Sequence, residues 1–169
     1  TLLRNICYER FGPTDEKTLG IELNLAMAHT SKDECPTTLS RLRKVHRICE
    51  RELGDRASVT LHARLNLAST LLRMGHHHKS ASLLKDRIRD YANVFGDCDT
   101  KTLAANQCLA LAYLEIGNSQ KAVNLIRANF EKYKDTLGET HPRTLSAISD
   151  LVRAYVSTDE TSKAIQRGE

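Results

Sequence analysis

Apolar residues along this chain recur at spacings of three and four positions, and the whole pattern repeats every 42 residues. The first stretch of each period places its leucines at Leu25, Leu67, Leu109 and Leu151. A second stretch follows, and in the third period its apolar positions are Val123, Ile126, Phe130, Tyr133 and Leu137. Because such spacings put apolar side chains on one helical face, each period predicts two amphipathic helices. No segment shows the alternation typical of a strand.

Glycine and threonine mark the same points of every period. The glycines are Gly12, Gly54, Gly96 and Gly138, and the threonines, each followed by leucine, are Thr18, Thr60, Thr102 and Thr144. Gly75 and Gly117 predict the end of a first helix, where a left-handed backbone favours glycine. Asp33 and Asp159 hold that position in the outer periods, which weakens the stop. Predicted N-caps of the next first helix are Asp15, Asp99 and His141, and Pro142 suits a first turn.

The second helices carry their own apolar stripes. In the second period the stripe runs through Ala81, Leu84, Ile88, Tyr91 and Phe95, and in the first through Leu39, Leu42, His46, Cys49 and Leu53. Small residues (Ser80, Ala122 and Ala164) stand where two helices must approach closely. The prediction is therefore an all-α chain of antiparallel helix hairpins stacked as a solenoid.

The period also divides the chain into repeats within one domain spanning residues 1–169. Residues 1–10 are expected to be the tail of a preceding repeat, followed by repeats at 11–52, 53–94 and 95–136 and a partial repeat at 137–169. Residues 160–169 are expected to begin another second helix, with Lys163 and Ala164 in register. Because both ends cut through the pattern without a polar capping helix, we expect an excerpt of a longer protein.

The residues at these positions carry a family resemblance. The string Leu65-Asn66-Leu67-Ala68, then Gly75 with a small residue five positions on, then Leu-Gly-x-x-His-Pro-x-Thr-Leu at 137–145, resembles the kinesin-light-chain type of tetratricopeptide repeat. It is similar too to arrays appended to NB-ARC or other STAND-type ATPases. Cys108-Leu109-Ala110 and Asp150-Leu151-Val152 depart from the Asn-Leu-Ala string. The resemblance implies a right-handed superhelical solenoid of about three full repeats with partial helices at both ends.

In such arrays the first helices resemble a lining of the concave side, where family members bind extended peptides or partner helices. The residues left over once the packing stripe is assigned predict that groove. They are Leu23, Asn24, Met27, His62, Leu65, Asn66, Ser69, Arg73, Gln107, Cys108, Leu111, Ser149, Asp150 and Arg153. Asparagine and glutamine amides offer a donor and an acceptor to a peptide backbone. Arg73 and Arg153 can each fork onto a carboxylate. Alternatively, Asn24 and Asn66 only bond neighbouring helices.

Composition narrows the functional class. The chain carries a net charge of +4, far from the strong basicity of a dedicated nucleic-acid binder. It contains no P-loop, dinucleotide-binding, zinc-protease or nucleophile-elbow string, so we expect no enzyme and no cofactor. No apolar run is long enough to span a membrane. Five cysteines without a C-x-x-C pair favour a reducing compartment, so a cytoplasmic protein is expected.

Two polar clusters allow more than one interpretation. His76, His77 and His78 follow Gly75, and consecutive residues point in different directions, so a solvated turn is favoured over a metal site. Arg43, Arg47 and Arg51 form a basic helical stripe that either faces solvent, paired with acids such as Glu50, or meets an acidic partner. His46 is expected to be a satisfied core histidine, and Cys7 and Cys49 small apolar core residues.

Three functional hypotheses follow. The first is a non-catalytic scaffold that binds a partner peptide or helix in the groove. The second is a sensor, autoinhibitory or oligomerisation arm of a larger STAND-type ATPase, packed on another domain of the same chain. The third is self-association, because uncapped repeat ends expose apolar helix faces. Neither nucleic acid nor membrane is expected as a partner.

Overall fold

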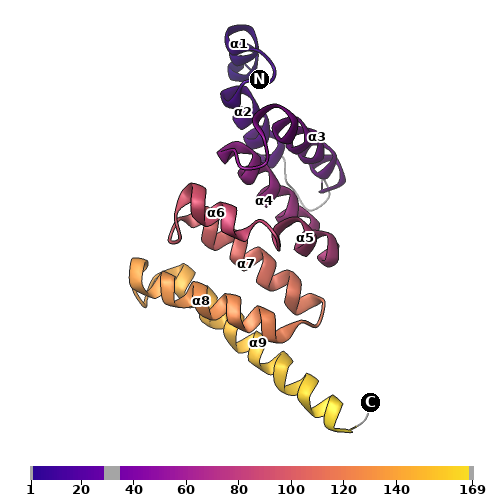
Figure 1. Ribbon diagram of the computed structural model, residues 1–169, viewed down its shortest axis with the longest axis vertical. Helices are drawn as coiled ribbons and strands as arrows, with labels where there is room; N and C mark the ends of the chain where they lie inside the picture. The colour runs from indigo at the N-terminus through magenta and orange to yellow at the C-terminus, as the bar shows by residue number, and fades with distance from the viewer. Residues whose placement is uncertain (1, 29–34, 168–169) are drawn as a thin grey trace.

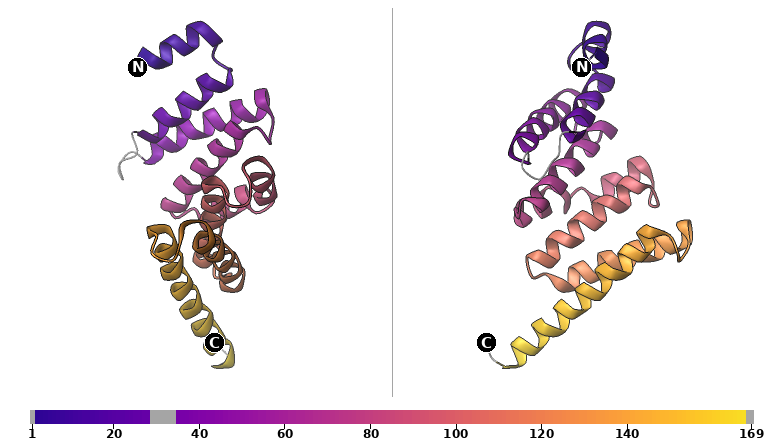
Figure 2. Two further views of the ribbon diagram at one scale, coloured as in Figure 1. Left: turned by 90° about the vertical axis from the view of Figure 1, so that its left-hand side faces the viewer. Right: turned by 180° about the vertical axis from the view of Figure 1, so that it is seen from behind.

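The computed structural model describes residues 2–28 and 35–167, and every regular element in these ranges is a helix. The helices stack along one axis, with the two termini at opposite ends of an elongated molecule (Figures 1 and 2). Their bounds are α1 Leu2–Phe11, α2 Glu16–Ala28, α3 Cys35–Leu53, α4 Ser58–Arg73, α5 His77–Leu84, α6 Ile88–Phe95, α7 Thr100–Glu115, α8 Ser119–Leu137 and α9 Pro142–Arg167. The all-α solenoid prediction is confirmed. Asp33 lies outside the described residues.

First and second helices alternate along the stack as the period predicts. The first helices are α2, α4, α7 and α9, and each packs against its neighbouring first helix as well as the second helices beside it. Leu19, Leu61 and Leu103 are at most 2% exposed at equivalent points of three repeats. The threonine before each of them is buried too, as is Thr144. In these three repeats the Thr-Leu pair is thus a packing position rather than a binding position, whereas Leu145 of the fourth pair is 51% exposed.

The ends of the helices follow the predicted capping chemistry. Asp99 caps α7 by accepting a hydrogen bond from the Lys101 amide at 2.7 Å, and Asp15 accepts one from the Lys17 amide at 2.9 Å. The ring of His141 does the same for the Arg143 amide at 3.2 Å. Each contact satisfies an amide that has no partner within its own helix. The three predicted caps are confirmed.

One second helix departs from the prediction, because the stretch from Ala81 to Phe95 is broken into α5 and α6. The Arg87 amide bonds the Leu84 carbonyl at 2.9 Å, an i to i+3 contact that tightens the chain into a turn. From this turn the Arg87 guanidinium reaches Asp55 at 2.6 Å in the loop before α4. At the equivalent point of the next repeat the shorter Asn129 stays inside an unbroken α8. The apolar stripe alone does not predict this break in the second helix.

The expected hairpin at the carboxyl end is also wrong. Helix α9 runs without interruption from Pro142 to Arg167, so residues 160–167 continue a first helix instead of beginning a second one. Gly75 and Gly117 end α4 and α7 with φ angles of +76° and +87°. The position equivalent to these glycines is Asp159, whose side chain makes that left-handed conformation costly. Without the glycine, the helix continues.

Candidate partner-binding groove

A cavity of about 290 Å³ lies between the first helices α4 and α7. From α4 it is lined by Leu65, Asn66, Ser69 and Leu72, and from α7 by Ala104, Gln107, Cys108 and Leu111. Residues at spacings of three and four share one face of each helix, so the two faces meet across the cavity. Six residues that the sequence analysis assigned to a groove therefore come together here, namely Leu65, Asn66, Ser69, Gln107, Cys108 and Leu111.

The lining of this cavity is apolar with a few polar groups at its edge. Leu65 and Cys108 are 8% and 7% exposed and belong to the hydrophobic core between α4 and α7, so they form its floor. The side-chain amide of Asn66 is half-buried and makes no hydrogen bond with any residue in the described part of the chain. The alternative that Asn66 serves only to bond a neighbouring helix therefore has no support in this structure.

Cys108 lines the cavity, but its thiol is not a reactive nucleophile. Its sulfur lies 3.7 Å from the hydroxyl of Ser80, which itself donates to the Ala68 carbonyl at 2.8 Å. Burial raises the pKa of the Cys108 thiol to about 11, and the Ser80 hydrogen bond offsets this only in part. The thiol is thus neutral near pH 7, because the reactive form of cysteine is the thiolate. The cavity offers a binding surface and no acid, base or nucleophile.

Polar contacts link Gln107, which lines the cavity, to side chains of α9. The Gln107 amide donates to Asp150 at 2.9 Å, and Arg153 lies 3.2 Å from the other oxygen of the same carboxylate. Both Gln107 and Arg153 were predicted to contact a bound ligand. In this structure they bond Asp150 instead, so each must exchange that contact to bind a partner.

The other predicted groove residues lie at various depths. Asn24, Arg73 and Ser149 are exposed, and Met27 and His62 are half-buried. Burial first, and then the positive charge of Lys101, lowers the pKa of His62. Leu23 was assigned to the groove, and that prediction is wrong: it is fully buried in the core between α2, α3 and α4. Leu23 lies two positions before Leu25, the leucine of the expected apolar stripe. It packs in the core as well, because the packed face of α2 is wider than one row of leucines.

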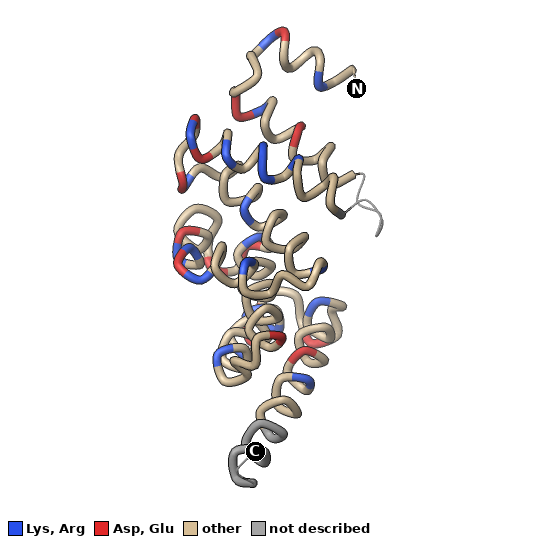
Figure 3. Tube along the Cα trace, turned by 90° about the vertical axis from the view of Figure 1, so that its right-hand side faces the viewer, with Lys and Arg blue, Asp and Glu red and all other residues tan. Residues whose placement is uncertain are grey.

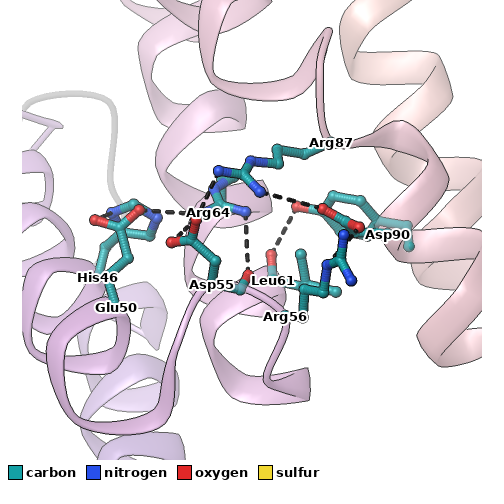
Figure 4. Close-up of polar contacts among 9 residues, drawn as sticks. His46, Glu50, Asp55, Arg56, Leu61, Arg64, Arg87 and Asp90 are labelled. Carbon is teal, nitrogen blue, oxygen red and sulfur yellow. Dashed lines mark hydrogen bonds and ion pairs between the residues drawn. The ribbon is translucent and has the colours of Figure 1, made fainter.

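A network of charged side chains, of which Arg64 and Asp90 are buried, joins the first and second repeats and was not predicted from the sequence (Figure 4). At its centre is Arg64, only 3% exposed at its side chain, which pairs with Glu50 of α3 at 3.0 Å and with Asp55 at 3.5 Å. Asp55 also pairs with Arg87 at 2.6 Å. Arg87 and the exposed Arg56 both approach Asp90, at 3.5 and 3.1 Å.

Comparison of the repeats contains a signal for this network. The positions 42 residues after Arg64 and Arg87 are Asn106 and Asn129, and their side chains bond each other at 3.1 Å. Asn129 also donates to the Leu103 carbonyl at 2.8 Å. Two polar residues at the same points of consecutive repeats, inside otherwise apolar helices, indicate a paired buried site. The contacts at these positions differ: Arg64 and Arg87 both pair with Asp55, whereas Asn106 and Asn129 bond each other directly.

His46 lies at the edge of this network and is only partly satisfied. Its Nδ1 is 3.4 Å from Glu50, whereas its Nε2 is buried and has no partner among the described residues. Burial lowers the pKa of His46, with the charge of Arg64 acting in the same direction and that of Glu50 against it. The core position predicted for His46 is confirmed, whereas the prediction that it is satisfied holds only for Nδ1 among the described residues.

The remaining polar clusters lie on the surface. Arg43, Arg47 and Arg51 are exposed on α3, and Arg51 pairs with Glu52 at 2.6 Å rather than with Glu50. His76 precedes α5, which begins at His77. Within residues 2–28 and 36–158, no cluster of three His, Cys, Asp or Glu side chains could hold a metal ion. Acidic and basic residues are interspersed along the array (Figure 3).

Comparison with known proteins agrees with this architecture. The tetratricopeptide repeat family matches residues 17–93. Two crystal structures of kinesin light chain-like, nearly identical TPR-like repeats from Podosopora anserina, one of them a substituted variant, superpose with TM-scores of 0.76 and 0.74. Each is 22% identical in sequence, and the match covers 98% of this chain and 78% of the other. No curated protein matches the chain.

These repeats are generally protein–protein interaction modules, and the fold is a non-catalytic repeat scaffold. No helix among the described residues has the length and apolar character needed to cross a membrane. Residues 17–93 match the tetratricopeptide repeat family, and the chain as a whole has the fold of an array of such repeats, similar in structure to kinesin light chain-like arrays.

Proposed function

We propose that this array is a scaffold that binds an extended peptide or a partner helix along its first helices, with the cavity between α4 and α7 as the central subsite. The observation that supports this most directly is the cavity itself, in which an apolar floor meets the unbonded amide of Asn66. An amide with both its donor and its acceptor available grips a peptide backbone independently of the side chains that the peptide carries.

The proposed binding mode uses three kinds of contact. An apolar ligand side chain enters the cavity and contacts Leu65, Leu72 and Leu111. Asn66 and the Ser69 hydroxyl bond the ligand backbone beside it. Arg73, exposed near the end of α4 and without an ion pair in the described part of the chain, pairs with an acidic ligand residue. The apolar contact supplies most of the binding free energy, and the amide contacts set the direction of the chain.

A peptide-display selection on the folded domain tests this mode. Selected peptides are measured against the wild type and the Asn66→Ala, Arg73→Glu variant by fluorescence polarisation. A matched control, Asn93→Ala with Arg41→Glu, makes the same chemical changes at exposed positions of second helices. We expect the groove variant to lose about tenfold or more in affinity and the control to bind as the wild type does. Equal affinities for all three proteins would refute groove binding, provided circular dichroism shows each to be folded.

The four cysteines whose side chains are described are unpaired, and three of them are buried. Unpaired thiols persist in reducing compartments. We therefore place the proposed scaffold in the cytoplasm, where its partner is a cytoplasmic protein or another domain of the same chain.

A second candidate function is stacking between copies, and one observation favours it. Among the described residues, the large apolar side chains that remain exposed lie at the two ends of the array, apart from Val94 of α6. Those at one end are Leu2, Leu3, Ile6, Tyr8 and Phe11, and those at the other are Leu137, Leu145, Ile148, Val152, Tyr155 and Val156. Such faces pack on a further repeat, and a second copy can supply it head to tail. Light scattering should show a mass that rises with concentration, and a constant monomer mass would exclude stacking.

A further inference from the structure

We infer that the second helices carry a binding surface of their own, separate from the groove, that takes an acidic peptide segment with one apolar anchor side chain. Its centre is an open hollow of about 600 Å³ between the α5–α6 turn, α7 and α8. Leu109 of α7 lines this hollow, whereas Leu111 lines the groove cavity. Residues two apart on a helix differ in direction by about 200°. The two sites therefore lie on opposite sides of α7.

The hollow has an apolar floor and a basic rim. Ile88, Leu109, Tyr113 and Leu125 form the floor. The rim carries three basic side chains, Lys85, Arg89 and Lys121, and one carboxylate, Asp86. All four of these charged residues are exposed. No ion pair joins any of them to another described residue, although Lys121 lies 5.6 Å from the centre of the Tyr113 ring. The rim has an excess of positive charge that nothing in the described chain neutralises, which selects an anionic partner.

The basic rim is part of a longer band that follows the repeat. The positions 42 residues before Lys85, Arg89 and Lys121 are Arg43, Arg47 and Lys79, all basic and all exposed. The arginine stripe of α3 therefore continues along the second helices into the hollow. A band that runs from the first repeat to the third suits an extended segment better than a compact small molecule, which binds in an enclosed pocket.

The shape of the site favours a peptide over a membrane. An interfacial helix inserts apolar side chains that project outward between the lipid headgroups. Here the apolar groups form the floor of a hollow, and Leu109 is only 3% exposed. A side chain that projects from the partner reaches this floor, whereas a flat bilayer surface does not. Acidic residues on either side of that anchor then meet the band of lysines and arginines.

The test uses synthetic peptides of the form Glu-Asp-Glu-X-Glu-Asp-Glu with X as Leu, Phe or Ser, titrated to millimolar concentration against the isotope-labelled domain. We expect the Leu or Phe peptide to bind and to shift the amide resonances of Arg89, Tyr113 and Lys121. The Ser peptide should bind at least several-fold more weakly, because it has no anchor. Equal binding of the Ser peptide, or no binding by any peptide, would overturn the inference.

Charge reversal then locates the site. The double substitution Lys85→Glu with Arg89→Glu should lower the affinity for the Leu or Phe peptide by about tenfold or more. The control Arg10→Glu with Arg143→Glu changes the net charge equally at two exposed positions off the band, and it should leave affinity almost unchanged. Equal weakening by both variants would show general attraction to a basic protein and would overturn the site.

Two further arms separate this surface from its alternatives. The groove variant Asn66→Ala with Arg73→Glu should bind these peptides as the wild type does, and loss of binding there would assign the peptide to the groove instead. Vesicles containing one third phosphatidylserine should not sediment the domain at physiological salt. Sedimentation that competes with the peptide would replace the peptide proposal by a membrane one.

Discussion

Arg64→Met tests whether the buried charges between the first two repeats stabilise the array. The substitution keeps most of the buried side-chain stem and removes the guanidinium that contacts Glu50 at 3.0 Å and Asp55 at 3.5 Å. Removing one partner from a fully buried ion pair costs about 3–5 kcal/mol. The side chains of Glu50 and Asp55 are 37% and 44% exposed, so water recovers part of that loss. We expect a net cost of about 2 kcal/mol, close to that of one hydrogen bond to a charged group.

Urea unfolding followed by circular dichroism measures this cost. The control is Arg56→Met, which breaks a pair with Asp90 at 3.1 Å from a side chain that is 77% exposed. Surface pairs of this kind contribute about 0–1 kcal/mol, so the control should lower the free energy of unfolding very little. A double-mutant cycle of Arg64→Met with Glu50→Gln should give a coupling of about 0.5–3 kcal/mol.

Two results would refute this reasoning. If Arg64→Met cost no more than Arg56→Met, the network would contribute nothing beyond a surface pair. If Arg64→Met raised stability, the desolvation of the guanidinium would outweigh its contacts, as happens when some buried ion pairs are replaced by apolar residues.

Three further predictions concern single side chains of the core. Tyr91→Phe removes a hydroxyl that donates to the Leu61 carbonyl at 2.7 Å and should lower the free energy of unfolding by about 1 kcal/mol in urea. Leu109→Ala empties a position that is 3% exposed and should cost about 2–5 kcal/mol; a cost below about 0.5 kcal/mol would mean that Leu109 is not packed. Burial lowers the pKa of His46, so the unfolded chain takes up the proton first and stability should fall as the pH drops below about 6.5. Melting temperatures at pH 7.5 and 5.5 should differ less in His46→Ile, which copies Ile88 of the next repeat, and an unchanged difference would rule out His46 as the source.

The period predicted the fold because each repeat satisfies the same local rules. A glycine with positive φ, a capping residue and a row of leucines recur at fixed spacing, and neighbouring repeats need no long-range information to stack. The two departures arose where one residue changed the local balance. Arg87, in the turn between α5 and α6, reaches Asp55, and Asp159 occupies the position at which Gly75 and Gly117 end α4 and α7.

The candidate site was less predictable than the fold. Helical spacing identified Asn66, Ser69 and Gln107 as neighbours across one cavity, since they lie on equivalent faces of adjacent first helices. It did not separate Leu23 from the groove, because the width of a packed face depends on what lies across it. The contact between Gln107 and Asp150 joins residues 43 positions apart and depends on side-chain torsions. Such pairings need the assembled structure.

The charged network between the first two repeats has a mechanical consequence. Because each repeat contacts mainly its neighbours, the array bends through small movements at each junction between consecutive repeats. Ion pairs such as Arg64 with Glu50 join the second repeat to the first and resist sliding in particular directions, whereas the apolar contacts around Phe130 and Tyr133 in the third repeat have no such directionality. Salt screens the partly exposed charges and leaves apolar contacts intact. Higher ionic strength should therefore make the array bend more easily at the junction between the first two repeats.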